Sequence, residues 1–436
     1  MKKTFTQVYS QYITQKKLNA SLKKKIWRLR THRFIAWNDF NKLTSVISFR
    51  LWQQYNHFKK YLVKPVFLFP FKSIFIVVYL AITICLYFIY KIFHFSSSFF
   101  SKPLPLSSLQ AEIDGVSFII PTWNKAKMVT DCVKKLSSIL EIESPKVKKE
   151  IIIVNNGSAD NTIKSITSIN SSISIRLINL PKNVGFASAI NLGVIESMYN
   201  YIYLMNNDMI PTPTFLSSII NFAQAKINQG SKFFGISSQI FFFDKNKRRE
   251  ESGKTYIYPY FGIIRAGHIV NSSNLQDPSP TCYPGGGSSL LNKHIFQKLG
   301  GYNSTIYRPM YCEDLDQGFL AWQYGFPSYF VPQSHIIHHH RSSSKKLTTD
   351  PSHYLFKNLL TFSLKNITSF SLFLKHIFYF PILSIIDDHH FNYLLGVLPI
   401  IPSIYLYKVR SLKYKYMHQD TSLFDFIKFE VKNDQF

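Results

Sequence analysis

The sequence predicts an α/β fold, a mostly parallel sheet flanked by helices, in a domain attached to a membrane, and three observations carry this prediction. Short apolar runs alternate with helix-like segments between residues 115 and 205, which is the order expected of a parallel sheet. Polar and acidic side chains follow these runs directly, where open α/β sheets bind their ligands. An apolar segment without charge precedes this region, so we expect the domain to be attached to a membrane.

Residues 1–60 form a basic arm that we predict to lie on a membrane surface. The arm has fourteen Lys or Arg and one acid, so it carries a net +13 of the chain's formal charge of +27. Trp27, Trp37 and Trp52 lie between the basic clusters, a pattern suited to the surface of an anionic bilayer. Binding to RNA and an ordinary solvated helix surface are the alternatives, and we predict no nucleic-acid partner.

Residues 61–100 are predicted to be a hydrophobic membrane segment. Its centre, SIFIVVYLAITICLYFIY, has eighteen residues without a charge, close to the minimum length of a transmembrane helix. Because Pro65 and Pro70 interrupt the apolar sequence before it, we expect the helix at about 73–90.

Two features conflict over the side of the membrane on which the chain lies. The positive-inside rule places the basic arm in the cytoplasm, and a single span would put the rest outside. The basic N-terminus lacks the apolar stretch of a signal peptide, and the four separated cysteines predict free thiols in a reducing compartment. We therefore expect the main domain at the cytoplasmic face of the cell membrane, with the arm outside or the apolar segment re-entrant or interfacial.

After a linker at 101–114, residues 115–345 are predicted to form the main domain. Strands are expected at VSFIIP, EIIIV, ISIRLINL and YIYLM, and helices near 125–140, 159–168 and 186–199. Residues 346–436 contain apolar stretches that prolines and an Asp-Asp-His-His run interrupt. We expect amphipathic, membrane-associated helices there rather than full spans.

Three loops follow predicted strands and carry short polar side chains. Asn206, Asn207 and Asp208 come directly after YIYLM, and a carboxylate there suits a hard divalent cation shared with phosphates. Turn formation, favoured by the prolines that follow, is the alternative for this loop. The segments TWN at 122–124 and NNGSADNT at 155–162 suit a nucleotide, although helix capping by Ser158 or Asp160 explains part of the second.

Acidic and histidine clusters follow later in the chain. Glu313, Asp314 and Asp316 lie among apolar and aromatic residues, so one carboxylate with a raised pKa could accept a proton from a hydroxyl. Acids are also favoured at a helix N-terminus, which is the alternative reading of this cluster. A short strand ends in three histidines at 338–340 and Arg341, candidates for a metal ligand and a phosphate contact.

Taken in this order, the elements resemble family 2 glycosyltransferases with the GT-A fold, of the non-processive kind that includes bacterial rhamnosyl- and galactofuranosyltransferases. The resemblance covers about 115–345 and rests on IIPTWN, VNNGSADNT, NVGFASAINLG, MNNDM, PGGGSSLL, EDLD and the histidine run.

The resemblance implies a role for each motif residue. It implies nucleotide contacts by Pro121, Thr122, Asn124, Asn155, Asn183 and Asn207. It implies that Asp208 and His338, with His340 as second choice, bind Mg²⁺ or Mn²⁺. Asp314 would be the general base, and Glu313, Asp316, Gly285, Gly286 and Gly287 would line the pocket for the acceptor and the donor sugar.

Three departures from the family pattern bear on function. Asn206 replaces the first acid of the usual Asp-x-Asp, and Asn155 stands where many members carry an Asp that reads the base. No Q-x-x-R-W motif follows the histidines, which argues against a processive polysaccharide synthase.

The activity that the resemblance implies is inverting transfer of a sugar from a UDP- or dTDP-sugar to a hydroxyl of a glycan or lipid-linked glycan, in the synthesis of cell-surface polysaccharide or glycolipid. Transfer to polyprenyl phosphate and a non-catalytic membrane scaffold of the same fold are the alternatives. The sequence leaves the donor sugar, the linkage and the oligomeric state open.

Overall fold

The structure is a computed structural model that describes residues 65–101, 112–243, 253–269, 275–338 and 351–413 of the 436-residue chain. The chain divides into two compact units, Met1–Pro70 and Phe71–Phe436, and the elements below belong to the second apart from the first residues of one helix. The basic arm, most of the linker, His339 to Arg341 and the last 23 residues lie outside the described residues.

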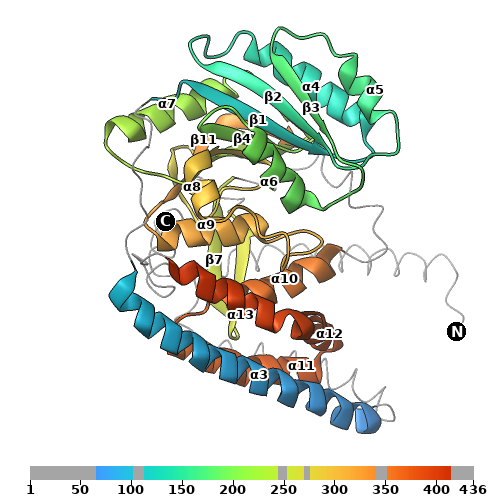
Figure 1. Ribbon diagram of the computed structural model, residues 1–436, viewed down its shortest axis with the longest axis vertical. Coiled ribbons are helices and arrows are strands. Elements are labelled where there is room, and N and C mark those ends of the chain that lie inside the picture. Colours follow the sequence, from blue (N-terminus) through green and yellow to red (C-terminus); the bar gives the residue numbers. More distant parts are fainter. Residues whose placement is uncertain (1–64, 102–111, 244–252, 270–274, 339–350, 414–436) are drawn as a thin grey trace, which may run out of the picture. The chain divides into compact units, whose positions relative to one another are not determined.

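A nine-stranded mixed sheet holds the main domain together (Figure 1). Its order is β3-β2-β1-β4-β10-β6-β11-β5, with β9 paired to β11. The strands are β1 (Gly115–Thr122), β2 (Lys148–Asn155), β3 (Ser174–Asn179), β4 (Tyr201–Met205), β5 (Met209–Pro211), β6 (Gly235–Phe242), β9 (Ser279–Thr281), β10 (Ser288–Asn292) and β11 (Ser328–His338). The first four strands in this order are parallel, whereas β10 runs antiparallel to both of its neighbours. The predicted α/β class and the four predicted strands are confirmed, but the sheet is less uniformly parallel than expected.

The central runs FII of β1, IIIV of β2 and YIYLM of β4 are apolar and buried because helices cover both faces of the sheet. In β1, Phe118 and Ile120 pack into one core cluster, and Ile119 between them packs into the cluster on the opposite face. The helices are α4 (Ala126–Leu140), α5 (Thr162–Thr167), α6 (Phe186–Glu196), α7 (Phe215–Asn228) and α8 (Lys293–Lys298). The predicted helices agree with α4, α5 and α6 to within a few residues.

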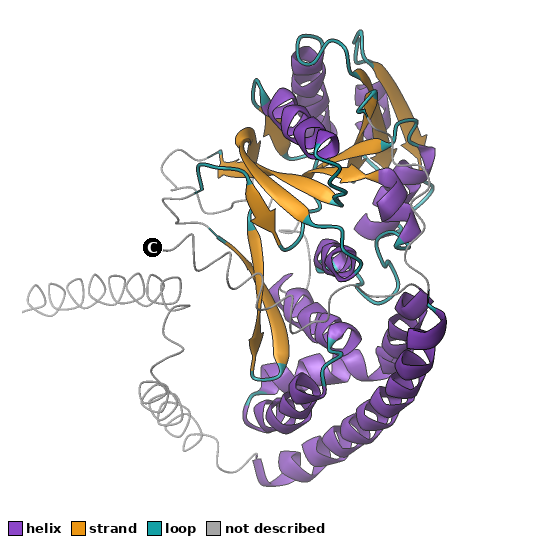
Figure 2. Cartoon of the chain, turned by 90° about the vertical axis from the view of Figure 1, so that its left-hand side faces the viewer, coloured by secondary structure: helices purple, strands orange, loops and turns teal. Residues whose placement is uncertain are grey.

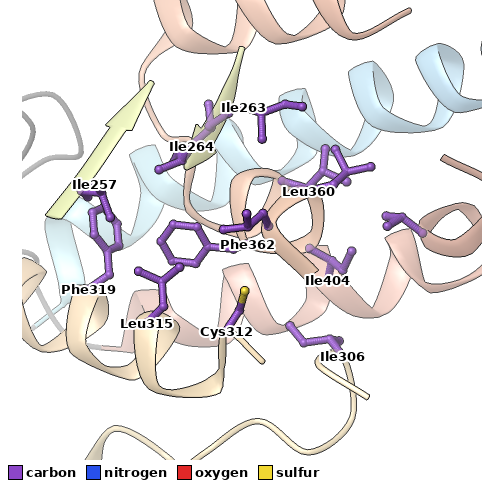
Figure 3. Close-up of a cluster of buried hydrophobic side chains, with 14 of the residues drawn as sticks. Ile257, Ile263, Ile264, Ile306, Cys312, Leu315, Phe319, Leu360, Phe362 and Ile404 are labelled. Atoms are coloured by element: carbon purple, nitrogen blue, oxygen red, sulfur yellow. The ribbon is translucent and has the colours of Figure 1, made fainter. Parts of the chain in front are cut away.

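A third core cluster joins a hairpin, α9 and helices from both ends of the second unit (Figures 2 and 3). It contains residues of β7 (Thr255–Tyr260), β8 (Ile263–His268), α3 (Pro65–Phe100), α9 (Glu313–Gln323), α10 (Pro351–Asn366), α11 (Phe370–Ile386), α12 (Asp388–Val397) and α13 (Ile401–Arg410). Leu315 and Phe319 of α9 lie beside Phe362 of α10 in this cluster. The helix with the acidic motif therefore packs on the C-terminal helices.

Helix α3 is longer than the predicted 73–90. It begins at Pro65 and runs through Pro70 to Phe100. A proline at the first position of a helix lacks only an N–H that would have no partner within the helix. Pro70 lies inside the helix and removes one backbone hydrogen bond, and the helix continues past it. Within the described residues it is the one helix long and apolar enough to cross a membrane.

The C-terminal apolar stretches form several short helices, as expected. Ser369 caps α11, since its side chain accepts a hydrogen bond from Leu372 N. Asp387 caps α12 in the same way through His389 N. Pro399 and Pro402 divide the last apolar stretch into α12, a 3₁₀ turn (Leu398–Ile400) and α13.

Candidate active site

The loops after β1, β2 and β4 meet at one edge of the sheet. These strands are neighbours and run parallel, so their carboxyl ends lie side by side. Asn207 Nδ2, after β4, donates to Thr122 Oγ1 at the end of β1 over 2.8 Å. Both side chains are buried, whereas Pro121 just before Thr122 is half-buried.

Asn124 ties the first two loops together. Its backbone has the left-handed φ of 52° that Asn tolerates. Its N–H donates to Ser158 Oγ at 2.9 Å, and its Oδ1 accepts from Ala159 N at 2.7 Å. Asn124 therefore shapes the edge of the predicted nucleotide site.

Asn155 holds its loop from within rather than presenting its amide to solvent. The residue is fully buried. Its Nδ2 donates to Asn179 Oδ1 at 2.6 Å, and its Oδ1 accepts from Ser158 N at 3.2 Å. Because protein groups occupy both ends of the amide, the geometry favours a positioning role for Asn155 over base recognition.

Asn183 is exposed and is held by Asn156, a residue that the sequence reasoning did not single out. Asn156 Nδ2 donates to Asn183 Oδ1 at 3.1 Å, and Asn156 Oδ1 accepts from Val184 N at 2.8 Å. The signal that points to Asn156 is the doubled Asn after β2. Asn155 bonds to Asn179 at the end of β3, and Asn156 bonds to Asn183 in the loop that follows β3.

Asp208 and His338 come together because β5 pairs with β11. Met209, next to Asp208, is the register partner of His338. His338 Nε2 lies 3.4 Å from Asp208 Oδ1, and both side chains are close to nine-tenths buried. Two adjacent ligand atoms, each about 2.1 Å from an octahedral ion, lie about 3 Å from each other. The two side chains are therefore close enough to occupy neighbouring coordination positions of one divalent cation. The described residues contain no group of three or more His, Cys, Asp or Glu that could hold a metal.

The glycine loop connects this edge to the acidic helix. Asn206 N donates to Gly287 O at 3.0 Å, and Gly286 N donates to Asp314 Oδ2 at 2.9 Å. A Cβ on Gly287 would lie 2.4 Å from Asn206 Nδ2, whereas one on Gly285 would meet nothing within 4 Å. The loop thus bonds both Asn206 and Asp314, and the predicted general base joins the same site as Asp208.

Asp314 is a half-buried carboxylate in the first turn of α9. Burial raises its pKa, and hydrogen bonds from Gly286 N and Leu315 N oppose that rise. A base of this kind has more proton affinity than an exposed carboxylate.

Glu313 precedes Asp314 in the chain, and its pKa is shifted more strongly than that of Asp314. Burial, and then the charge of Asp314, raise the pKa of Glu313 to about 8. In the part of the chain that the structure describes, no group donates to Glu313 Oε2. Burial and the adjacent carboxyl group thus both favour the protonated form of Glu313.

Two tyrosines beside Asp314 were not anticipated. Burial and the charge of Asp314 raise the pKa of both Tyr283 and Tyr302. The backbone of Tyr302 is fixed by Asn191, whose Nδ2 donates to Tyr302 O and whose Oδ1 accepts from Tyr302 N. Asn191 belongs to NVGFASAINLG, and this contact explains its place in the motif.

Asp316, assigned to the sugar pocket from the sequence, faces the C-terminal helices instead. Its Oδ2 accepts from Lys365 Nζ at 2.5 Å and its Oδ1 from Asn366 Nδ2 at 2.9 Å. All three residues are buried. Both oxygens are used by α10, so the geometry favours a structural role that joins α9 to α10.

Comparison with known sequences identifies the family. Residues 117–282 match the family model described as Glycosyl transferase family 2. These residues belong to glycosyltransferase family 2. The matched glycosyltransferase region contains the three strand-end loops and Asp208, while Asp314 and His338 lie beyond its end.

Curated relatives are similar over a shorter length. The poly-beta-1,6-N-acetyl-D-glucosamine synthase of Staphylococcus epidermidis is 33% identical over 111 residues, which is 26% of each chain. The synthase of the same name from Staphylococcus aureus is 33% identical over 99 residues, or 23% of each chain. The chain thus matches these curated relatives over about a quarter of their length.

Solved structures are similar at low identity. GalNAc-T7 with UDP, GalNAc and Mn²⁺ superposes with a TM-score of 0.47 and 13% identity, covering 67% of this chain and 58% of that one. A mannosyltransferase of Pyrobaculum calidifontis in complex with GDP-Man and Mn²⁺ gives a TM-score of 0.38 and 12% identity, over 77% and 97% of the two chains.

Proposed function

We propose that this protein transfers a sugar from a nucleoside-diphosphate sugar to a hydroxyl group with inversion at the anomeric carbon. The observation that carries the proposal is the bonded path from Asn206 through Gly287 and Gly286 to Asp314. It brings a carboxylate with a raised pKa to the strand-end loops of a family 2 glycosyltransferase region.

Each part of the site has a task in this reaction. The loops held by Thr122, Asn124 and Asn156 bind the nucleotide, and Asp208 and His338 would hold a divalent cation. Such a cation would offset the charge of the departing diphosphate. Asp314 accepts the proton of the attacking hydroxyl, which bonds to the anomeric carbon as the diphosphate leaves. One displacement inverts the configuration.

The acceptor class follows from two further features. The similar staphylococcal proteins are named as synthases of a polysaccharide, and we place this protein in the synthesis of cell-surface polysaccharide or glycolipid. The absence of Q-x-x-R-W after the histidines favours addition of single sugars. The apolar helix α3 favours a lipid-linked acceptor and work at the inner face of the cell membrane.

Release of nucleoside diphosphate by the detergent-purified protein tests this proposal. A panel of UDP- and dTDP-sugars is assayed with membrane extract as the source of acceptors, with and without Mn²⁺. We expect metal-dependent release from one donor and a loss of about 10²- to 10⁴-fold in Asp314→Asn, the usual contribution of a general base. Asp131→Asn on the exposed side of α4 is the matched control and should keep full activity. Undiminished release by Asp314→Asn would remove Asp314 as the base, and no release from any donor would favour a non-catalytic scaffold.

A further inference from the structure

From Phe71 onward, α3 lies beside α11 (Figure 1), and the order of their contacts shows that the two helices run antiparallel. The rings of Tyr87 and Phe373 stack with their centroids 3.6 Å apart. Eight residues earlier on α3, the hydroxyl of Tyr79 lies 2.5 Å from Nε2 of His376, which is further along α11. The hydroxyls of Tyr79 and Tyr87 are thus both bonded to the C-terminal part of the chain, Tyr79 to His376 and Tyr87 to Thr368 O.

The packed side of α3 extends over most of the helix. Near its start, Lys72 Nζ pairs with Asp388 Oδ1 at 2.5 Å. Just past its end, Ser101 Oγ donates to Leu412 O at 2.9 Å. Twenty-nine residues separate these contacts, about 43 Å of helix, whereas the hydrocarbon core of a bilayer is about 30 Å thick. The C-terminal helices therefore accompany α3 over more than the thickness of a membrane.

The opposite side of α3 and the adjoining side of α11 are apolar and exposed. On α3 six large apolar side chains have 41–69% of their surface open: Ile74, Val78, Phe88, Ile92, Phe95 and Phe99. The exposed residues Ala81 and Cys85 fill the gap in this row, so its members recur every three or four positions. On α11 they recur every fourth position with 43–63% open: Phe370, Leu374, Phe378, Ile382 and Ile386. We call these two rows the apolar face. Contiguous apolar surface of this extent marks an interaction site.

The residues packed on the buried side of α3 argue against a helix that crosses the bilayer perpendicular to its plane. Lys408 of α13 is buried against α3, with its Nζ 4.5 Å from the centre of the Tyr90 ring and bonded to Leu364 O at 3.0 Å. Leu315 and Phe319 of α9 belong to the same continuous cluster as the tyrosines of α3. If α3 stood upright in the bilayer, this lysine and the helix that carries the acidic motif would be carried to membrane depth, where a charge is costly.

We propose that α3 and α11 lie side by side in the plane of one membrane leaflet, with the apolar face in its hydrocarbon. Tyr379 is 38% exposed, and Lys375 is exposed in the row beside the apolar face. Such side chains suit the level of the lipid headgroups. In this arrangement the chain enters and leaves the membrane on the same side. The basic arm and the glycosyltransferase region then share the cytoplasmic face, and the positive-inside rule is satisfied.

Labelling of cysteines tests the sidedness. Cys85 is exposed, whereas the other three cysteines are buried, so a full-length Cys85→Ala chain is a background without a reactive thiol. Thr4→Cys and Glu112→Cys then report on the two sides of α3. An impermeant maleimide is applied to spheroplasts and to inverted vesicles, and detergent-solubilised samples show that both thiols react. We expect both positions to react in inverted vesicles only. Labelling from opposite sides would establish a crossing helix and overturn the proposal.

Flotation with phosphatidylcholine–phosphatidylglycerol vesicles tests the apolar face itself. Phe88→Glu and Phe378→Glu should each lower the partition coefficient at least tenfold, because burial of a Phe side chain is lost. Ile195→Glu, at a residue of α6 that is 63% exposed, is the matched control and should change it less than twofold. All three sites are more than half exposed, so we expect unchanged thermal unfolding. Unchanged vesicle binding with a shift from dimer to monomer would assign the face to a second copy and contradict the proposal.

Discussion

At the scale of single residues, the two neighbouring carboxyl groups at the start of α9 differ in what surrounds them. Asp314 accepts two backbone hydrogen bonds that stabilise its ionised form, while one oxygen of Glu313 has no donor among the described residues. The hydrogen bonds thus oppose the rise in the pKa of Asp314, whereas burial and the adjacent carboxyl group raise the pKa of Glu313 to about 8. A pair of this kind separates the roles of two like groups by environment.

Glu313 predicts a pH dependence of stability. Below a pH of about 4.5, Glu313 is protonated in both the folded and the unfolded protein. Between that value and about 8, it ionises only in the unfolded protein, so the free energy of unfolding falls as pH rises. Glu313→Gln should therefore gain a few kcal/mol relative to wild type between pH 5 and 8. Urea denaturation of both proteins across this range measures the difference. A difference that does not change with pH would show that Glu313 ionises normally in the folded protein.

Asp208 and His338 predict a metal site that can be measured without catalysis. His338→Ala should weaken Mn²⁺ binding in the presence of UDP by at least tenfold, since loss of even an outer partner of a metal ligand costs ten- to hundredfold. Electron paramagnetic resonance of free Mn²⁺ gives the affinity. His335→Ala, three residues earlier on β11 and exposed, serves as the control. Equal affinities for the two variants would contradict the role of His338.

At the scale of elements, close approach of two loops shapes the nucleotide site. Gly157, in the loop after β2, has φ of 72°, and a Cβ there would lie 2.4 Å from the backbone carbon of Lys182. Gly230 has φ of 73° with nothing within 4 Å. The two glycines thus share a backbone conformation and differ in their neighbours.

This contrast predicts different effects of the same substitution. Gly230→Ala should cost about 1 kcal/mol of stability, from backbone strain alone. Gly157→Ala should cost more and should weaken binding of the donor nucleotide at least tenfold, because the loop that carries Asn183 must move away. Calorimetric titration with UDP together with thermal unfolding measures both. Equal behaviour of the two variants would show that the loops need not touch.

What the sequence predicts well is local, and what it misses is set by long-range pairing. The run YIYLM predicts β4 at its observed bounds, because an apolar run ended by turn-forming residues specifies a buried strand without help. The role of Asp316 depends on Lys365, 49 residues away, and no spacing rule reveals that partner. Asn156 and Asn183 likewise meet only in the folded chain. The metal pair and the base were named from motif resemblance, and their roles stay predictions.

At the scale of the whole second unit, one chain joins the proposed nucleotide site, the proposed base and an apolar face. The glycine loop links the first two, and the third core cluster links α9 to α3 and α11. The site and the proposed membrane surface are therefore parts of one packed body. An acceptor anchored in the same leaflet would reach the base without leaving the membrane.

The configuration of the product tests the central claim most directly. The claim is that Asp314 and the donor site act together in a single displacement. With an α-linked nucleotide sugar as donor, proton nuclear magnetic resonance of the freshly formed glycoside should show a β linkage in the wild type, and Asp314→Asn should form product about 10²- to 10⁴-fold more slowly. An α linkage would mean retention of configuration, and this account of the site would then be wrong.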